Sequence, residues 1–269
     1  MMMIKMDYSN EFNQDGGFVL AASPRAKKEY GIKTSSRRYE IPRHSFIQIV
    51  EPQMTLYLRI NEIIIAIFLE FVSENDLHLY SIDESFLDVT ASHTLYGSTK
   101  EIALKIQATI WQRFRLVVTI GIGDNPLMAK LALDNAAKKT PNGIAEWHYE
   151  MVSETIWNIH PITEMWDIGQ LTAANLYRLG IDSVYSLSTY SAQSLKRTHR
   201  IIGEQLFYYA HGIDQSIIAQ NYIPLSNFFS KSQILDRDYI DQYEIEVVIR
   251  EMADQVAIKR SGLVDGHQG

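Results

Sequence analysis

Two adjacent acidic residues, Asp83 and Glu84, are the strongest candidates for chemistry in this 269-residue sequence. They lie between two runs typical of strands, residues 77–80 and 86–89, which predicts a hairpin with the acids at its turn. Neighbouring carboxylates repel each other unless a cation compensates their charge. Carboxylate oxygens suit Mg²⁺ or Mn²⁺, and Mg²⁺ often binds through one or two carboxylates plus substrate phosphates. A metal site is one interpretation of this pair, and a solvated acidic turn is the alternative.

A basic segment between residues 25 and 43 carries the opposite charge. It holds seven Lys or Arg against two acids, a local excess of +5 in a chain whose net charge is −7. Such a local field can attract phosphate groups. Arg25 and Lys28 lie one turn apart on a predicted helix that begins at Pro24 and ends at Tyr30 before Gly31. The alternative for each lysine is a solvated charge without a partner.

The elements that would position these residues alternate between strand and helix periods in the first half of the chain, as an α/β or α+β layered fold requires. Near residue 150–160 the strand signals fade, and short helices separated by glycine turns run to about residue 215. The predicted strands are 17–22, 77–80, 86–89, 116–122 and, after a linker at 221–226, 228–235. The predicted helices are 24–30, 61–72, 98–113, 127–138, 171–179, 191–196, 203–211 and 243–258.

The composition excludes several classes of protein. With 46% apolar residues, 21% charged residues and no Cys, the chain is neither disordered nor stapled by disulfides, and it has no thiolate chemistry. The negative net charge argues against binding nucleic acid by bulk positive charge. The longest apolar run, residues 63–69, falls short of a membrane helix, and the N-terminus has no secretory signal pattern. A cytoplasmic protein without a membrane partner is therefore expected.

Several motifs, in order and at matching spacing, resemble the Y-family translesion DNA polymerases, as written in the UmuC/ImpB/MucB/SamB branch. The resemblance spans about residues 15–260. Its motifs are 81–88, 118–123, 128–132 and 139–143 for the palm, 17–33 for the fingers, 166–169 and 176–181 for the thumb, and 229–238 for the little finger.

The resemblance implies an α+β fold with a partial palm, built as a ferredoxin-like sheet with helices. It also implies small fingers, an all-helical thumb with helix–hairpin–helix-like turns and the start of an α/β little finger. The implied parts are a leader at 1–16, fingers at 17–50, palm at 51–155, thumb at 156–220 and a truncated little finger at 221–269.

The resemblance also implies the roles of individual residues in two-metal catalysis with Mg²⁺. Asp83 would bridge the metals, and Glu84 would hold the one nearer the primer 3′ oxygen. Ser81 and Ser85 are interpreted as hydroxyls that satisfy the turn. The residues implied to bind the nucleotide triphosphate are Arg25, Lys28, Lys139 and Lys138. The residues implied to contact the DNA backbone are Gly169, Gly180, Lys196, Arg197, Arg200 and Gly203, although ordinary helix ends are the alternative for each glycine.

The sequence departs from the family pattern at both ends. The family's palm begins with a strand bearing an Asp, followed by paired aromatics that include the gate against ribonucleotides. Here residues 1–16 lead almost directly into the fingers segment, and Asp7 stands in a polar run that is not predicted as a buried strand. We therefore do not assign Asp7 as the missing metal ligand. The expectation is a family member shortened at both ends, with one family carboxylate absent.

The predicted function is template-directed nucleotidyl transfer on damaged primer–template DNA with a deoxynucleoside triphosphate, in translesion synthesis, DNA repair and the SOS response. Because the site is expected to be incomplete, the chain alone should have weak or no polymerase activity. A sliding clamp or accessory repair proteins are the partners implied for the full-length form. The alternatives are a non-catalytic DNA-binding or partner-binding fragment and a decayed, poorly folded product.

Overall fold

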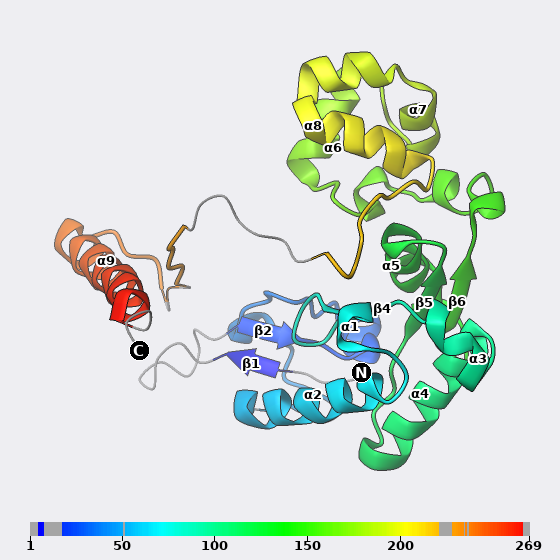
Figure 1. The fold of residues 1–269 in the computed structure, drawn as a ribbon. Helices are drawn as coiled ribbons and strands as arrows, with labels where there is room; N and C mark the ends of the chain where they lie inside the picture. The colour runs from blue at the N-terminus through cyan, green and yellow to red at the C-terminus, as the bar shows by residue number, and fades with distance from the viewer. Residues whose placement is uncertain are drawn as a thin grey trace. The chain divides into compact units, whose positions relative to one another are not determined.

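Strands and helices alternate up to residue 147, and only helices follow in the described part of the chain (Figure 1). The computed structural model describes residues 5–7, 18–50, 52–220, 228–233, 235 and 237–265. The chain divides into a larger unit at 56–221 and a smaller unit formed by 2–55 and 222–269.

The smaller unit contains a two-stranded antiparallel sheet of β1 (Lys5–Asp7) and β2 (Phe18–Ala21). The helix α1 (Pro24–Tyr30) follows as predicted, because the Ser23 side chain accepts a hydrogen bond from Ala26 N and Gly31 ends the helix at φ 67°. A small core holds this part of the chain together. It consists of Val19, Ala22, Ala26, Ile32 and Ile41.

A strand, β1, forms in the run that contains Asp7, which the sequence did not predict as a buried strand. Asp7 pairs with Phe18, and Met6 pairs with Val19. A three-residue strand is too short to show an alternating apolar pattern, and pairing with the backbone edge of β2 decides its conformation. The edge of β2 is therefore paired along its length rather than left open.

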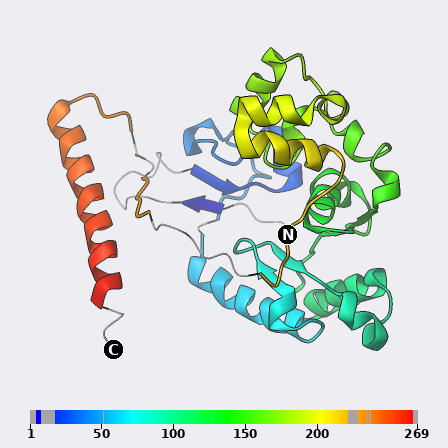
Figure 2. The same ribbon diagram turned by 45° about the horizontal axis from the view of Figure 1, so that its top comes forward.

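The last helix, α9 (Gln242–Asp265), confirms the predicted helix at 243–258 and is longer than expected (Figure 2). The strand predicted at 228–235 is wrong, because no strand forms among the described residues of that range. Phe228 is 90% exposed. A single extended segment without a partner leaves its backbone groups to water and gains no ladder hydrogen bonds. The predicted linker at 221–226 lies outside the described residues.

The larger unit begins with α2 (Met54–Leu69), which starts seven residues before the predicted helix. An antiparallel hairpin of β3 (Leu77–Leu79) and β4 (Ser85–Leu87) follows, as predicted. After the short helix α3 (His93–Tyr96), the helix α4 (Thr99–Phe114) also confirms its prediction, because Ser98 and Glu101 form a capping box. The buried contacts of α2 and α4 form one core. Its fully buried members are Ile67, Ile102, Ile106 and Ile110.

A parallel pair of strands carries the next helix. The strand β5 (Ile120–Gly123) pairs with β6 (Ile144–Trp147), which the sequence pattern did not predict. The predicted strand at 116–122 shrinks to four residues because its partner offers only four. The helix α5 (Pro126–Asn135) packs closely on β5, since a Cβ at Gly121 would collide with the Ala129 carbonyl oxygen.

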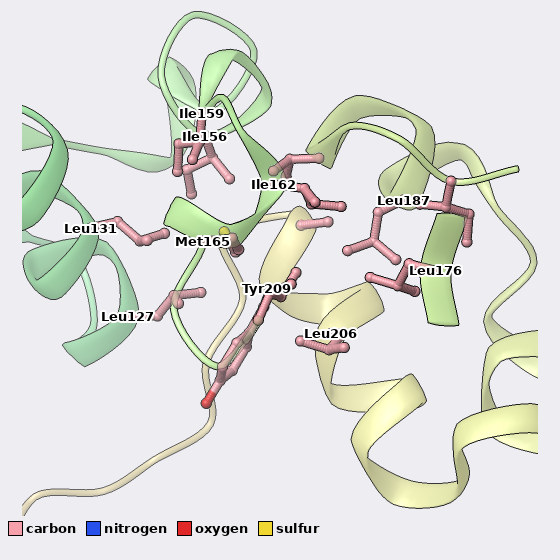
Figure 3. Close-up of a cluster of buried hydrophobic side chains, with 14 of the residues drawn as sticks. Leu127, Leu131, Ile156, Ile159, Ile162, Met165, Leu176, Leu187, Leu206 and Tyr209 are labelled. Carbon is pink, nitrogen blue, oxygen red and sulfur yellow. The ribbon is translucent and has the colours of Figure 1, made fainter. Parts of the chain in front are cut away.

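The helical region, residues 156–220, contains α6 (Gln170–Arg178), α7 (Val184–Thr189) and α8 (Ala192–Ala210). Two helices were predicted over the span of α8, and its two halves are separated by a kink at Arg200, whose backbone is not helical. The helix α7 was not predicted. Figure 3 shows how this region shares one buried core with α5. The core includes Leu127, Leu131, Ile156, Ile159, Ile162, Met165, Leu176, Leu187, Leu206 and Tyr209.

Candidate functional site

The turn of the β3–β4 hairpin carries Asp83 and Glu84, as the sequence predicts. The backbone N–H groups of Tyr80 and Ser81 both donate to the Glu84 carbonyl oxygen, at 3.1 and 3.0 Å. The Ser81 hydroxyl donates to Asp83 Oδ1 at 2.8 Å. The turn is thus fixed by its own backbone and one hydroxyl group, while the Asp83 side chain stays exposed to solvent.

Lys130 on α5 contacts the carboxylate of Glu84. Its Nζ atom donates to both Glu84 oxygens at 2.8 Å and lies 3.2 Å from Asp134 Oδ2. The Lys130 side chain is only 11% exposed. Burial acts to lower the pKa of Lys130, but the hydrogen bond to Glu84 and the charge of Asp134 outweigh it and raise the pKa above its usual value. Lys130 therefore remains a cation beside Glu84.

A chain of alternating charges extends from the hairpin along α5. Asp134 contacts Lys130 on one side and accepts a 2.6 Å hydrogen bond from Lys138 Nζ on the other. Lys138 is exposed, as is Lys139, which has no ion pair among the residues that the structure describes. A continuous series of ion pairs thus links a candidate metal ligand with a candidate phosphate ligand. Its members are Glu84, Lys130, Asp134 and Lys138.

An open cleft of about 470 Å³ lies beside the end of this charge chain. Asp134 and Lys138 line one side, and residues 163–169 line the other. Asp167 in this segment has a left-handed backbone, with φ 66°. Desolvation of its carboxyl group raises the pKa of Asp167, and the charge of Asp214 acts in the same direction.

The donor atoms at the hairpin turn fit a hard cation. Asp83 and Glu84 offer only carboxylate oxygens, which Mg²⁺ prefers, and Mg²⁺ can complete its shell with water and phosphate oxygens. Within the described ranges, no cluster of three or more His, Cys, Asp or Glu side chains is arranged to hold a metal. Asp83 and Glu84 on this turn offer oxygens that suit such a cation, and their role as metal ligands stays a prediction.

The candidate phosphate ligands of the smaller unit lie on α1. Arg25 forms an ion pair with Glu29 at 2.9 Å, and its guanidinium group lies 5.9 Å from the centre of the Phe46 ring. Lys28 is exposed and has no ion pair within the described part of the chain. The two side chains were predicted to act together, and only Lys28 is left without a carboxylate neighbour.

The candidate DNA-binding glycines differ from one another. Gly169 begins α6 and Gly180 follows it at φ 79°, and both have open space where a Cβ would be. Gly203 is buried inside α8, where a Cβ would collide with the Leu195 carbonyl oxygen. No turn forms at Gly203, because packing between the two halves of the kinked helix requires this glycine, and the DNA contact implied for it stays a prediction.

The basic residues of α8 also differ. Lys196 forms an ion pair with Glu204 at 2.7 Å, whereas Arg197 and Arg200 are exposed. Arg200 forms the kink with φ 57° and ψ −139°, a conformation that is essentially restricted to glycine. The kink turns the chain so that Ile201 is 77% exposed beside this arginine.

Comparison with known proteins places the chain in a family. A family model described as impB/mucB/samB matches residues 6–134, a range that begins within β1. UvrX of Bacillus subtilis (strain 168), named as a UV-damage repair protein, is 45% identical over 245 residues, or 91% of this chain and 58% of UvrX. YobH of the same organism, named as a DNA repair protein homolog, is 44% identical over 156 residues, or 58% of this chain and 72% of YobH. The chain belongs to the impB/mucB/samB family.

The fold of this impB/mucB/samB protein matches solved polymerases. A Y-family DNA polymerase chimera of Dbh and Dpo4 superposes with a TM-score of 0.68 and 21% identity, covering 96% of this chain and 72% of the chimera. This confirms the predicted α+β fold of the Y-family polymerases. The chain spans less than three fifths of the length of UvrX. No helix in the described ranges is both long and apolar enough to cross a lipid bilayer.

Two features of the site escaped sequence reasoning. Lys130 lies within the motif at 128–132 and four residues before Asp134, a spacing that places both on one helix face. Its contact with Glu84, however, joins residues 46 positions apart, which no local pattern reveals. The second feature is Trp166, whose ring lies 5.8 Å from Tyr80 and 6.1 Å from Phe86 on the hairpin.

Proposed function

We propose that this impB/mucB/samB protein derives from a DNA-directed DNA polymerase of translesion synthesis and that Asp83 and Glu84 are its metal ligands. The observation that carries the proposal is the position of both acids on the β3–β4 turn, within a fold shared with Y-family polymerases. Two divalent cations, when bound at such a site, activate the attacking oxygen and neutralise the leaving pyrophosphate. Asp83 would help to hold both cations, and Glu84 would hold the one nearer the primer 3′ oxygen.

Basic residues within each unit are proposed to bind phosphate groups. Lys28 and Lys139 are proposed to bind the triphosphate of the incoming deoxynucleotide, because both are exposed and neither has a carboxylate partner within the described residues. Arg25 and Lys138 would join them after exchanging Glu29 and Asp134 for phosphate oxygens. Each exchange replaces one exposed ion pair with another and so costs little free energy.

The helical region is proposed to hold the backbone of damaged primer–template DNA. Gly169 and Gly180 have open space for a close approach, and Arg197 and Arg200 supply exposed positive charge. Lys196 would first have to leave Glu204. Such contacts position the duplex without reading its sequence.

The same proposal includes partners and a cellular role. We propose that a sliding clamp or accessory repair proteins bind the full-length form, and that the protein acts in the SOS response.

We also propose that the catalytic site of this chain is incomplete and its polymerase activity weak. Two divalent cations bring four positive charges, whereas Asp83 and Glu84 bring two negative charges. The charge of Glu84 is already compensated by Lys130 at 2.8 Å. Further carboxylates or the substrate phosphates themselves would have to supply the difference.

Primer extension by the purified full chain tests the catalytic proposal. With Mg²⁺ or Mn²⁺, a primed template and four deoxynucleotides, we expect slow extension or none, and any extension should be lost in Asp83→Ala. Robust extension would contradict the incomplete site. Slow extension that persists in Asp83→Ala would contradict the assignment of the metal ligands.

A non-catalytic DNA-binding protein is the second candidate, and the engagement of Glu84 by Lys130 favours it. This function predicts primer–template binding that weakens steeply with added salt and is unchanged in Asp83→Ala. Fluorescence anisotropy with a labelled primer–template measures both properties. Absence of binding at low salt would rule out this candidate.

A further inference from the structure

We infer that Lys130 is a positioning residue that acts as the internal counter-ion of Glu84 and competes with a divalent cation for that carboxylate. The inference rests on the proposed function of Glu84 as a metal ligand. Lys130 donates to both carboxylate oxygens at the same distance, 2.8 Å. With the ammonium group against both oxygens, a divalent cation that binds Glu84 meets the positive charge of Lys130 next to it.

Lys130 is held in place by the packing of α5. Its neighbours Leu127, Met128 and Leu131 are fully buried in the core shared with the helical region. The helix that carries it packs closely on β5. Its own side chain is 11% exposed, whereas that of Glu84 is 31% exposed. The buried lysine therefore sets the position of the more exposed carboxylate.

Asp134 gives Lys130 a second partner. The Lys130 Nζ atom already lies 3.2 Å from Asp134 Oδ2, so release of Glu84 does not leave the ammonium group without a carboxylate. A buried cation left unpaired would be costly, and Asp134 removes most of that cost. Glu84 can thus exchange a lysine for a divalent cation without a rearrangement of α5.

The exchange also reaches Lys138. Asp134 binds Lys138 Nζ at 2.6 Å. Once Glu84 is released, Asp134 is the carboxylate that remains beside Lys130, so it should hold Lys138 less tightly. Lys138 borders the 470 Å³ cleft. Cation binding at Glu84 is therefore expected to make the Lys138 ammonium group more available to a phosphate in the cleft.

Binding of Mn²⁺ to the full chain tests the competition, with free Mn²⁺ measured by electron paramagnetic resonance. Removal of the competing ammonium in Lys130→Met should tighten Mn²⁺ binding about three- to fivefold, the factor for one partly exposed ion pair. Lys130→Arg should restore the affinity of the unmodified chain. The matched control is Lys138→Met, which removes the same charge from the other side of Asp134 and does not touch Glu84, and it should change affinity less than twofold.

A double-mutant cycle separates the exchange from a general charge effect. Asp134→Asn leaves Glu84 as the main partner of Lys130 and should weaken Mn²⁺ binding, and this effect should vanish in the Lys130→Met background. Circular dichroism confirms that each variant is folded. If Lys130→Met were unfolded, the weaker Mn²⁺ binding expected for Asp134→Asn alone would still test the inference.

The outcomes distinguish this inference from the proposed function. If the unmodified chain binds Mn²⁺ and loses it in Glu84→Gln, yet Lys130→Met does not differ from Lys138→Met, the counter-ion role is overturned and the metal site stands. If neither the unmodified chain nor Lys130→Met binds Mn²⁺, both the metal site and the inference are overturned. Tighter binding in Lys130→Met alone supports both.

Discussion

Trp166 lies edge-on against Tyr80, with ring centroids 5.8 Å apart and ring planes at 76°. Trp166 also stacks on the buried Tyr209 of α8, with an angle of 11° between the planes. The backbone N–H of Tyr80, like that of Ser81, donates to the Glu84 carbonyl oxygen. One tryptophan therefore connects the core of the helical region with the turn that carries the candidate metal ligands.

Replacement of this tryptophan should destabilise the larger unit. Trp166→Ala removes contacts with Tyr80, Phe86 and Tyr209, and we expect a loss of about 2–3 kcal/mol in the free energy of unfolding, below the range for a fully buried aromatic ring because Trp166 is half-buried. Urea denaturation followed by far-UV circular dichroism measures it.

A second tryptophan provides the matched control. Trp111 is 45% exposed, and its ring lies 5.5 Å from the Arg115 guanidinium group. Trp111→Ala should therefore cost about 1 kcal/mol or less. Equal losses for the two variants would show that the contact with the hairpin contributes nothing beyond ordinary surface burial.

The backbone of Arg200 predicts a stabilising substitution. Because φ 57° and ψ −139° suit glycine, Arg200→Gly should raise the free energy of unfolding by about 1 kcal/mol. Arg197→Gly, three residues earlier in regular helix, should lower it by about 1 kcal/mol. Thermal unfolding of both variants checks the opposite signs, and a destabilised Arg200→Gly would indicate that the arginine side chain makes a contact worth more than the strain.

The stability of the larger unit should depend on the protonation of His148. Its hydrogen bond with Asp124 at 2.7 Å raises its pKa, partial burial opposes this, and a further hydrogen bond with Glu146 at 3.1 Å adds to the increase. Because the pKa of His148 is raised in the folded state, the protonated imidazole stabilises the fold. This stabilisation is complete below about pH 6.5, and it is lost as pH rises through the pKa of His148 in the folded protein. Urea denaturation at pH 6 and pH 8.5 should show the decrease.

The variant His148→Gln isolates that decrease. Glutamine cannot take up a proton, so the difference in free energy of unfolding between the two pH values should become smaller than in the unmodified chain. An identical pH dependence in both proteins would assign the effect to other groups.

Salt dependence tests the proposed DNA contact of Arg197. Arg197→Ala should weaken primer–template binding and reduce the slope of log affinity against log salt by about 1, as expected for one lost phosphate contact. The control is Arg113→Ala on α4, which removes an arginine that is paired with Glu70. This variant should leave the slope of log affinity against log salt unchanged. Fluorescence anisotropy between 50 and 200 mM salt, about the range over which such slopes are measured, distinguishes the two.

Local signals in the sequence were sufficient where the structure is decided locally. Ser23, Pro24 and Gly31 define α1 at both ends, and the acids of the β3–β4 turn follow from the two short apolar runs around them. The strand β6 was missed because four residues give little pattern and its pairing with β5 is not local. The same reason applies to β1, whose conformation depends on the edge of β2.

The chemistry of the site was less accessible from sequence than its position. The pairing of Lys130 with Glu84 depends on how α5 packs on β5, and only the folded chain brings them together. The glycines also show that residue type alone does not define the role of a residue. Gly203 has the residue type expected of a turn near DNA, but its role is to let Leu195 approach within a kinked helix.

The core shared by α5 and the helical region has a consequence for how this chain opens. Leu127 and Leu131 of α5 lie in the same buried cluster as Leu176, Leu187 and Leu206, so the helical region cannot detach without exposing one face of α5 to water. Amide protons of α5 and of the second half of α8 should therefore exchange with deuterium through one common, cooperative opening rather than through separate local fluctuations. The helix α5 carries Lys130, the partner of Glu84, and α8 carries the arginines proposed to bind DNA. These two helices would then unfold and refold together as one thermodynamic unit.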